Sequence, residues 1–136
     1  MKSYCVCNNL LGWLMFLMST TIYFLTTDPS VSLWDCGEWI TVANGLQVGH
    51  PPGAPLYILL AKIFSLLSFG NTALVAFCIN SLSAVASGLT VMFLFWTTTF
   101  FVSQLFQNKA HSSITHPQLV IFGSGIVAAL CFTFFG

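Results

Sequence analysis

The sequence predicts an all-α polytopic membrane protein, and three observations lead to this fold class. The chain of 136 residues is 57% hydrophobic and only 4% charged, whereas soluble domains carry roughly 25% charged residues. Its mean hydropathy is +0.90, and so few charges cannot cover a surface that faces water. The apolar residues also gather into runs long enough for membrane helices. A formal net charge of zero, with no basic tract, excludes a nucleic-acid-binding class.

Residues 10–26 form the first apolar run. About 17 residues at a rise of ~1.5 Å per residue span roughly 25 Å, which is just enough to cross a bilayer. The run ends in Thr26-Thr27-Asp28-Pro29 without a small-residue cleavage site, so it is predicted to be a retained anchor and no cleaved signal peptide. Lys2 precedes it, which predicts a cytoplasmic N-terminus and an extracytoplasmic segment after the helix.

Residues 28–70 are predicted to form an outer loop with juxtamembrane helices. The apolar run 55–69 is short and carries Lys62 near its middle. A lysine at mid-bilayer depth costs about 3 kcal/mol on insertion scales. We therefore expect an interfacial helix, with Lys62 reaching the lipid headgroups.

Residues 72–106 are predicted to form a long transmembrane helix that tilts or projects from the bilayer, capped at its start by Asn71 or Thr72. Ala84 and Gly88 form a small-x-x-x-small pair on one face of it, which favours close helix packing. Asn80 shares that face, with packing or ligand binding as its alternative roles.

Residues 107–118 are predicted to form a cytoplasmic loop, because they carry Lys109. Residues 119–136 would start the next transmembrane helix. The chain ends on this apolar run, so residues 1–136 are expected to be the N-terminal part of a larger single transmembrane domain.

The polar chemistry of the chain gathers around Asp35 and Glu38, for which two roles compete. Asp35 as N-cap with Glu38 three residues later resembles a capping box on a short amphipathic helix. Alternatively, one carboxylate acts as a general base at the membrane surface. The second would then orient the first, or help to hold a divalent cation such as Mg²⁺ or Mn²⁺ on a phosphate leaving group.

The stretch Gly49-His50-Pro51-Pro52-Gly53-Ala54-Pro55 is predicted to be a rigid turn, because its prolines fix φ and stop the preceding helix. His50 on this turn either is structural or meets a phosphate or an acceptor hydroxyl. His111 and His116 are expected to be solvated. No zinc-ligand spacing occurs, and the positions of the five cysteines do not predict a disulfide framework.

Two phrases carry a resemblance to a known family. W-D-C-G-E stands at Trp34 to Glu38, and V-G-H-P-P-G-A-P stands at Val48 to Pro55. Together they resemble the transmembrane protein 260-type protein O-mannosyltransferase family, which also contains many bacterial members of unassigned function; the chain is expected to be one of these. The family is similar to the GT-C superfamily of glycosyltransferases, whose first outer loop holds the catalytic carboxylate and juxtamembrane helices.

The resemblance implies a transferase that moves a sugar, such as mannose, from a polyprenyl-phosphate donor in the membrane lipid to a hydroxyl acceptor, such as Ser or Thr of an exported protein. Asp35 is then the expected base, Glu38 its partner, and His50 and Lys62 bind the substrate phosphate. The alternatives are a transporter or flippase, or a non-catalytic membrane scaffold in which Asp35 and Glu38 only cap a helix.

Overall fold

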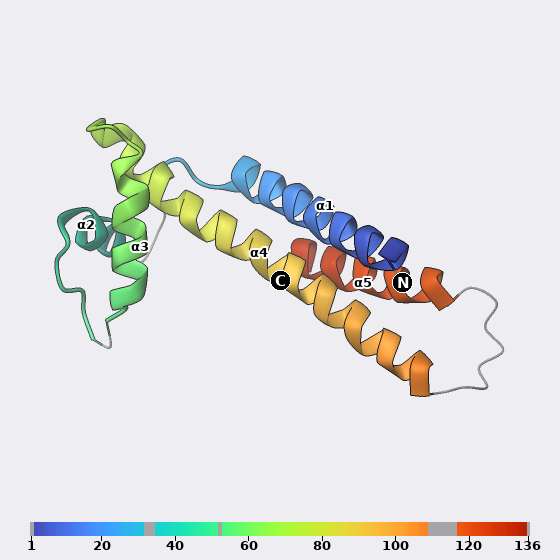
Figure 1. The fold of residues 1–136 in the computed structure, drawn as a ribbon. Coiled ribbons are helices and arrows are strands. Elements are labelled where there is room, and N and C mark those ends of the chain that lie inside the picture. Colours follow the sequence, from blue (N-terminus) through green and yellow to red (C-terminus); the bar gives the residue numbers. More distant parts are fainter. Residues whose placement is uncertain (1, 32–34, 52, 109–116, 136) are drawn as a thin grey trace. The chain divides into compact units, whose positions relative to one another are not determined.

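The computed structural model describes residues 2–31, 35–51, 53–108 and 117–135 and shows an all-α chain, with no strand among these residues. Five helices follow one another (Figure 1): α1 (Lys2–Thr26), α2 (Cys36–Gly45), α3 (Pro55–Leu66), α4 (Thr72–Asn108) and α5 (Pro117–Phe135). Three stretches are apolar and long enough to cross a bilayer, namely Tyr4–Thr26, Thr72–Phe106 and Pro117–Phe135. The predicted class of all-α polytopic membrane protein is therefore confirmed.

The helix ends differ from the apolar runs that predicted them. α1 begins at Lys2 instead of residue 10, because the amides of Asn8 and Asn9 interrupt the hydropathy but do not break a helix. α5 begins at Pro117, and proline is tolerated in a first helical turn because the N–H group there has no helical partner. The predicted loop residues Lys109, His111 and His116 lie outside the described residues.

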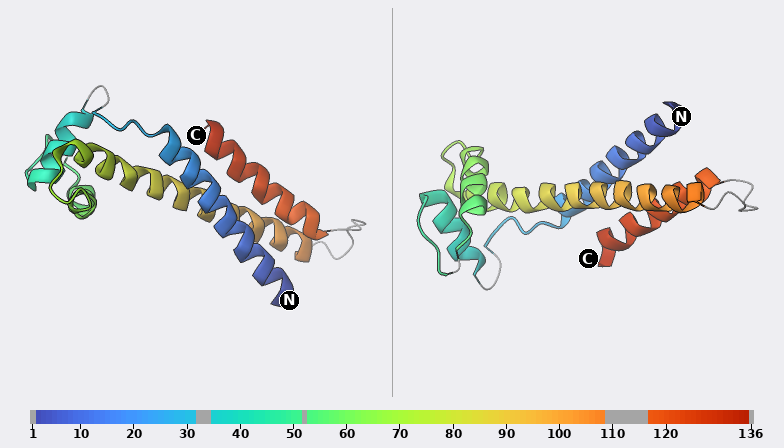
Figure 2. Two further views of the ribbon diagram at one scale, coloured as in Figure 1. Left: turned by 90° about the horizontal axis from the view of Figure 1, so that it is seen from above. Right: turned by 60° about the horizontal axis from the view of Figure 1, so that its bottom comes forward.

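Two compact units divide the chain, and each is described by itself. The first comprises Met1–Ile22 and Ser87–Gly136, in which α1, the second half of α4 and α5 pack against one another (Figure 2). Phe95 and Val91 are fully buried in it. Tyr4 of α1 stacks on Phe122 of α5 with ring centroids 5.3 Å apart.

Glycines let these helices approach closely. A Cβ on Gly88 would lie 3.1 Å from Thr20 Cβ and 3.3 Å from Phe16, so the predicted packing role of this position is confirmed. A Cβ on Gly125 would lie 2.7 Å from Thr99 Cγ2 and 2.9 Å from the Phe95 ring. These contacts require glycine because any side chain would have to displace buried atoms.

The second unit, Tyr23–Ala86, holds α2, α3 and the first turns of α4. Its apolar core consists of Ile40, Ala43, Ala61 and Ile79, drawn from all three helices. The side chain of Asn71 accepts a hydrogen bond from the Ala73 N–H at 3.1 Å and so caps α4, as predicted.

Asn80 ties the polypeptide that follows α1 to α4. Its Nδ2 donates to the main-chain carbonyls of Asp28 at 3.1 Å and Ser30 at 3.4 Å. The Asp28 carboxylate in turn accepts from the Ser30 N–H at 2.8 Å and from its hydroxyl at 2.7 Å. These hydrogen bonds order the start of the predicted outer loop against α4.

α3 is short and leaves one apolar stripe uncovered. Its 12 residues extend only about 18 Å, less than a bilayer core. The stripe consists of six exposed residues at helical spacing: Leu56, Leu59, Leu60, Ile63, Leu66 and Leu67. This pattern fits a helix that lies on a membrane, and its place at the interface stays a prediction.

Candidate active site

Asp35 stands at the N-cap position of α2, but the predicted capping box does not form. Its backbone angles, φ −75° and ψ 0°, are not the extended ones of a typical N-cap, and its side chain makes no capping hydrogen bond. Only its main-chain carbonyl joins the helix, by accepting from the Trp39 N–H at 3.1 Å. The exposed carboxylate of Asp35 is therefore not committed to the helix.

Glu38 binds His50 instead of the start of the helix. Its Oε1 accepts the His50 main-chain N–H at 2.9 Å, and His50 Nδ1 lies 2.9 Å from Oε1 and 3.0 Å from Oε2. Twelve residues separate the two partners in sequence. Because both carboxylate oxygens of Glu38 contact His50, Glu38 does not make the bond back to the N-cap that a capping box requires. This pairing also holds His50 against the first turn of α2.

The pair changes the acidity of both groups. The hydrogen bond from the His50 main-chain N–H, followed by that from its ring, lowers the pKa of Glu38. The hydrogen bond and then the charge of Glu38 raise the pKa of His50, to which the Asp35 carboxylate adds a smaller contribution. Nδ1 of His50 faces Glu38, so Nε2 is the ring nitrogen that the pair does not use.

Trp39 packs against His50 of this pair and against Tyr57. Its ring centroid lies 5.3 Å from that of His50, and 6.2 Å from that of Tyr57 in an edge-to-face arrangement. A Cβ on Gly49 would lie 3.2 Å from the Trp39 ring, so the backbone at Gly49 approaches this ring closely. Gly53 has φ +72°, a conformation that other residues rarely adopt.

A hollow of about 310 Å³ opens beside Trp39. Tyr57 of α3 lines it together with Asn80 and Ser83 of α4, and Cys36 brings it next to Asp35 in the sequence. The sequence alone does not predict that Trp39, Tyr57, Asn80 and Ser83 line one site. The one available signal was that the aromatic residues Trp39 and Tyr57 flank the polar stretch.

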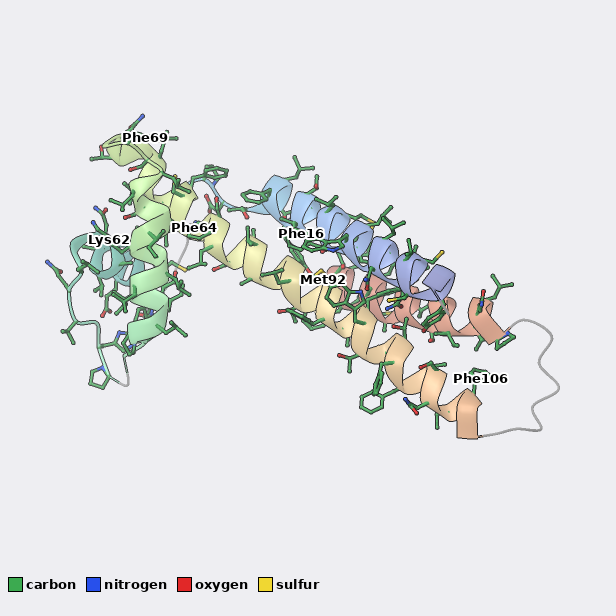
Figure 3. All side chains as sticks on the ribbon, in the orientation of Figure 1. Phe16, Lys62, Phe64, Phe69, Met92 and Phe106 are labelled. Atoms are coloured by element: carbon green, nitrogen blue, oxygen red, sulfur yellow. The ribbon has the colours of Figure 1, made fainter. Side chains whose placement is uncertain are left out.

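Lys62 does not join the acidic pair. Its ammonium donates to the main-chain carbonyl of Asn44 (Lys62 is labelled in Figure 3). Asn44 lies in the last turn of α2, where carbonyls lack helical partners and a cation is favourable. Asn44 lies roughly 13 Å along the helix axis from Asp35, as nine residues at about 1.5 Å each imply. The structure thus gives Lys62 a helix-capping contact, and the expected headgroup contact stays a prediction.

No group of three or more His, Cys, Asp or Glu side chains gathers in the part of the chain that the structure describes. Both oxygens of Glu38 are engaged by His50, so Asp35 is the one carboxylate of this site left for a cation. These residues do not fit a protein-built site for Mg²⁺ or Mn²⁺, each of which prefers several oxygen ligands.

Comparison with known proteins shows which family the chain resembles. Residues 35–136 match the family model described as "Protein O-mannosyl-transferase TMEM260 N-terminal domain". The chain is 40% identical over 90 residues to "Protein O-mannosyl-transferase tmem260" of Dictyostelium discoideum, a match that covers 66% of this chain and 11% of that protein. It is 37% identical over 84 residues to the TMEM260 protein of Mus musculus, which covers 61% of this chain and 12% of that protein.

No solved structure matches the chain. The matched segments thus span only 11% and 12% of the two curated relatives. Both relatives are eukaryotic, so the expectation of a bacterial member stays a prediction. The family model covers the site from Asp35 onward together with α2 to α5, and on that ground the chain belongs to the family of the TMEM260 N-terminal domain.

Proposed function

We propose that the full-length protein is a membrane glycosyltransferase of the GT-C type. It transfers a mannosyl group from a polyprenyl-phosphate donor to a hydroxyl acceptor, such as Ser or Thr of an exported protein. The two relatives are both named protein O-mannosyl-transferases. The observation that carries the proposal is the uncommitted carboxylate of Asp35 beside the charge-assisted Glu38–His50 pair.

In the proposed reaction Asp35 acts as general base. It takes the proton of the acceptor hydroxyl while the hydroxyl oxygen forms a bond to the anomeric carbon. The bond from that carbon to the lipid phosphate breaks, and its electron pair leaves on the phosphate oxygen. The transition state resembles an oxocarbenium ion, as in glycoside hydrolysis, and a single displacement inverts the configuration.

His50 is proposed to meet the leaving phosphate. Its raised pKa favours the imidazolium form, in which Nε2–H donates to a phosphate oxygen. Glu38 acts through His50 as a positioning residue, since it holds both the ring and the main chain of the turn. Lys62 is left out of this role because it binds Asn44, and no step is assigned to a divalent cation.

The decisive experiment is Asp35→Asn in the full-length protein, assayed with a mannosyl-phosphate polyprenol and a Ser/Thr peptide. Transfer should fall by at least ~100-fold, since positioned bases contribute about 10² to 10⁴ in rate. Asp28→Asn is the matched control: it is the same change on the same loop, at a residue whose carboxylate binds Ser30 and whose bond to Asn80 is made by the main chain, which the substitution keeps. Transfer by Asp35→Asn at the rate of the control would overturn the assignment.

The transporter alternative has less support. The three candidate spans, Tyr4–Thr26, Thr72–Phe106 and Pro117–Phe135, contain no Asp, Glu, Lys, Arg or His. Transport pathways are marked by ionisable residues or broken helices at mid-membrane depth. If the protein is a non-catalytic scaffold, Asp35→Asn should leave its cellular function unchanged, just as Asp28→Asn should.

A further inference from the structure

We propose that the hollow beside Trp39 is the binding site for the mannosyl ring of the donor; this rests on the function proposed above. The hollow is built from three helices: Trp39 comes from α2, Tyr57 from α3, and Asn80 and Ser83 from α4. None of these residues belongs to the Asp35, Glu38 and His50 group.

The aromatic pair supplies a platform for an apolar sugar face. Trp39 and Tyr57 meet edge to face at 6.2 Å with an interplanar angle of 88°, so the two rings form a corner. Trp39 is held from one side by His50 and from another by Tyr57. A rigid aromatic corner contacts the C–H face of a pyranose without needing a charge.

The polar groups of the hollow suit hydroxyls. In the described part of the chain, no hydrogen bond engages the hydroxyls of Tyr57 and Ser83 or the Oδ1 of Asn80. The Nδ2 of Asn80 binds two main-chain carbonyls, so its Oδ1 is held in a fixed orientation. Burial, with a smaller effect of Cys36, raises the pKa of Tyr57, which keeps its hydroxyl protonated as a donor.

Charge and size narrow the ligand to a neutral monosaccharide ring. Among the described residues that line the hollow there is no Asp, Glu, Lys, Arg or His, so they offer no charge to neutralise a phosphate. Its volume of about 310 Å³ is at the lower end of ligand sites, which run from about 300 to 1,000 Å³. It therefore suits a ring and not a polyprenyl chain.

The hollow lies where the reaction needs it. Cys36 lines it and is covalently linked to Asp35, so a ring bound there would have its anomeric carbon near the backbone of the proposed base. The phosphate on that carbon would extend toward His50, whose ring packs on Trp39. The sugar, its leaving group and the base then have separate protein partners.

The test uses Tyr57→Phe and Ser83→Ala in the full-length protein. Each removes one hydroxyl and little volume, so folding should persist. We expect the KM for mannosyl-phosphate polyprenol to rise roughly ten-fold in each variant, the effect of about one lost hydrogen bond. Thr41→Val is the matched control, because it removes an α2 hydroxyl that binds the Gly37 carbonyl and does not line the hollow.

A second readout does not depend on turnover. Saturation-transfer NMR with methyl α-mannoside should detect binding to the wild type and to Thr41→Val, and weaker binding to Tyr57→Phe. Unchanged KM in both hollow variants, or no mannoside binding to the wild type, would overturn the sugar site. If Asp35→Asn still abolishes transfer in that case, the proposed function stands without it. Mannoside binding with full activity of Asp35→Asn would retain the sugar site and reject the base.

Discussion

At the scale of single residues, Glu38 makes a different contact from the one that its spacing from Asp35 predicts. The interval from Asp35 to Glu38 is that of a capping box, yet Glu38 binds the ring and the main chain of His50. Two charged groups that are both exposed contribute little to global stability. Their value is local, because they fix a histidine on a proline-rich turn beside the Asp35 carboxylate.

The pair predicts a pH dependence with two limits. Because the pKa of His50 is raised, the local stability that its bond to Glu38 contributes is complete below the ordinary histidine value of 6.5. That stability is lost as pH rises through the raised pKa. Because the pKa of Glu38 is lowered, the stability that its carboxylate contributes is present above the ordinary glutamate pKa of 4.5. That stability is lost as pH falls through the lowered pKa. Transfer should be greatest between these limits.

Glu38→Gln tests which group sets the alkaline limit. Without the carboxylate, the pKa of His50 should fall, and the alkaline limb of the kcat profile should move to lower pH. Asp28→Asn should leave that limb in place, since Asp28 binds Ser30 and not His50. An unmoved limb in Glu38→Gln would show that the Glu38–His50 pair does not control the step. A full kcat profile for the three proteins decides this.

At the scale of elements, close packing at glycine decides how α5 meets its neighbours in the first unit. A Cβ at Gly125 would lie 2.7 Å from Thr99 Cγ2 and 2.9 Å from Phe95, which is fully buried. A Cβ at Gly123, two residues earlier on the same helix, would meet nothing within 4 Å. The two glycines thus differ in packing while sharing one helix.

Gly125→Ala should therefore destabilise the protein, by about 1 to 3 kcal/mol, because overpacking forces buried side chains to shift. Gly123→Ala is the matched control, and it should be neutral or slightly stabilising because alanine favours helices. Thermal unfolding of the purified protein in detergent gives the comparison. Equal Tm values for the two variants would contradict the packing contact.

α3 shows a further consequence of its amphipathic pattern. Ala61 is fully buried in the second unit and Lys62 reaches Asn44, while Leu59 and Ile63 are exposed. The ammonium of Lys62 binds a carbonyl at the C-terminus of α2, where a cation is favourable. The apolar stripe remains as the reason to expect a membrane surface beside this helix.

At the scale of the whole molecule, sidedness follows from how many crossings separate the loops. The candidate spans Tyr4–Thr26 and Thr72–Phe106 enclose the Asp35 segment, and Pro117–Phe135 follows the next loop. With Lys2 inside, the Asp35 segment is extracytoplasmic and residues 109–116 are cytoplasmic. This arrangement is a proposal, and it would place the base where exported acceptors appear.

Cysteine labelling checks the arrangement. Val48 is 95% exposed, so Val48→Cys in an otherwise cysteine-free full-length protein should react with a membrane-impermeant maleimide on intact cells. Lys109→Cys should react only after permeabilisation. Labelling of both positions on intact cells would require an even number of crossings between them, and α3 would then have to be counted as a span.

The sequence by itself determined the membrane class, the three long apolar helices and the neighbourhood of the site. Hydropathy is a local property, and a run of about 20 apolar residues has no stable alternative to a helix in lipid. The start of α3 was also readable, because Pro55 can begin a helix but cannot continue one. The start of α1 was missed by eight residues, since hydropathy marks the span and not the helix that extends beyond it.

Only the tertiary structure decided which side chains meet. The partner of Glu38 is twelve residues away and that of Lys62 is eighteen. In each pair the two residues belong to different segments, so the spacing within one helix does not bring them together. The hollow beside Trp39 draws its lining from three helices. Contacts between helices depend on how their apolar faces pack, and that packing is a property of the assembled second unit, not of any one segment.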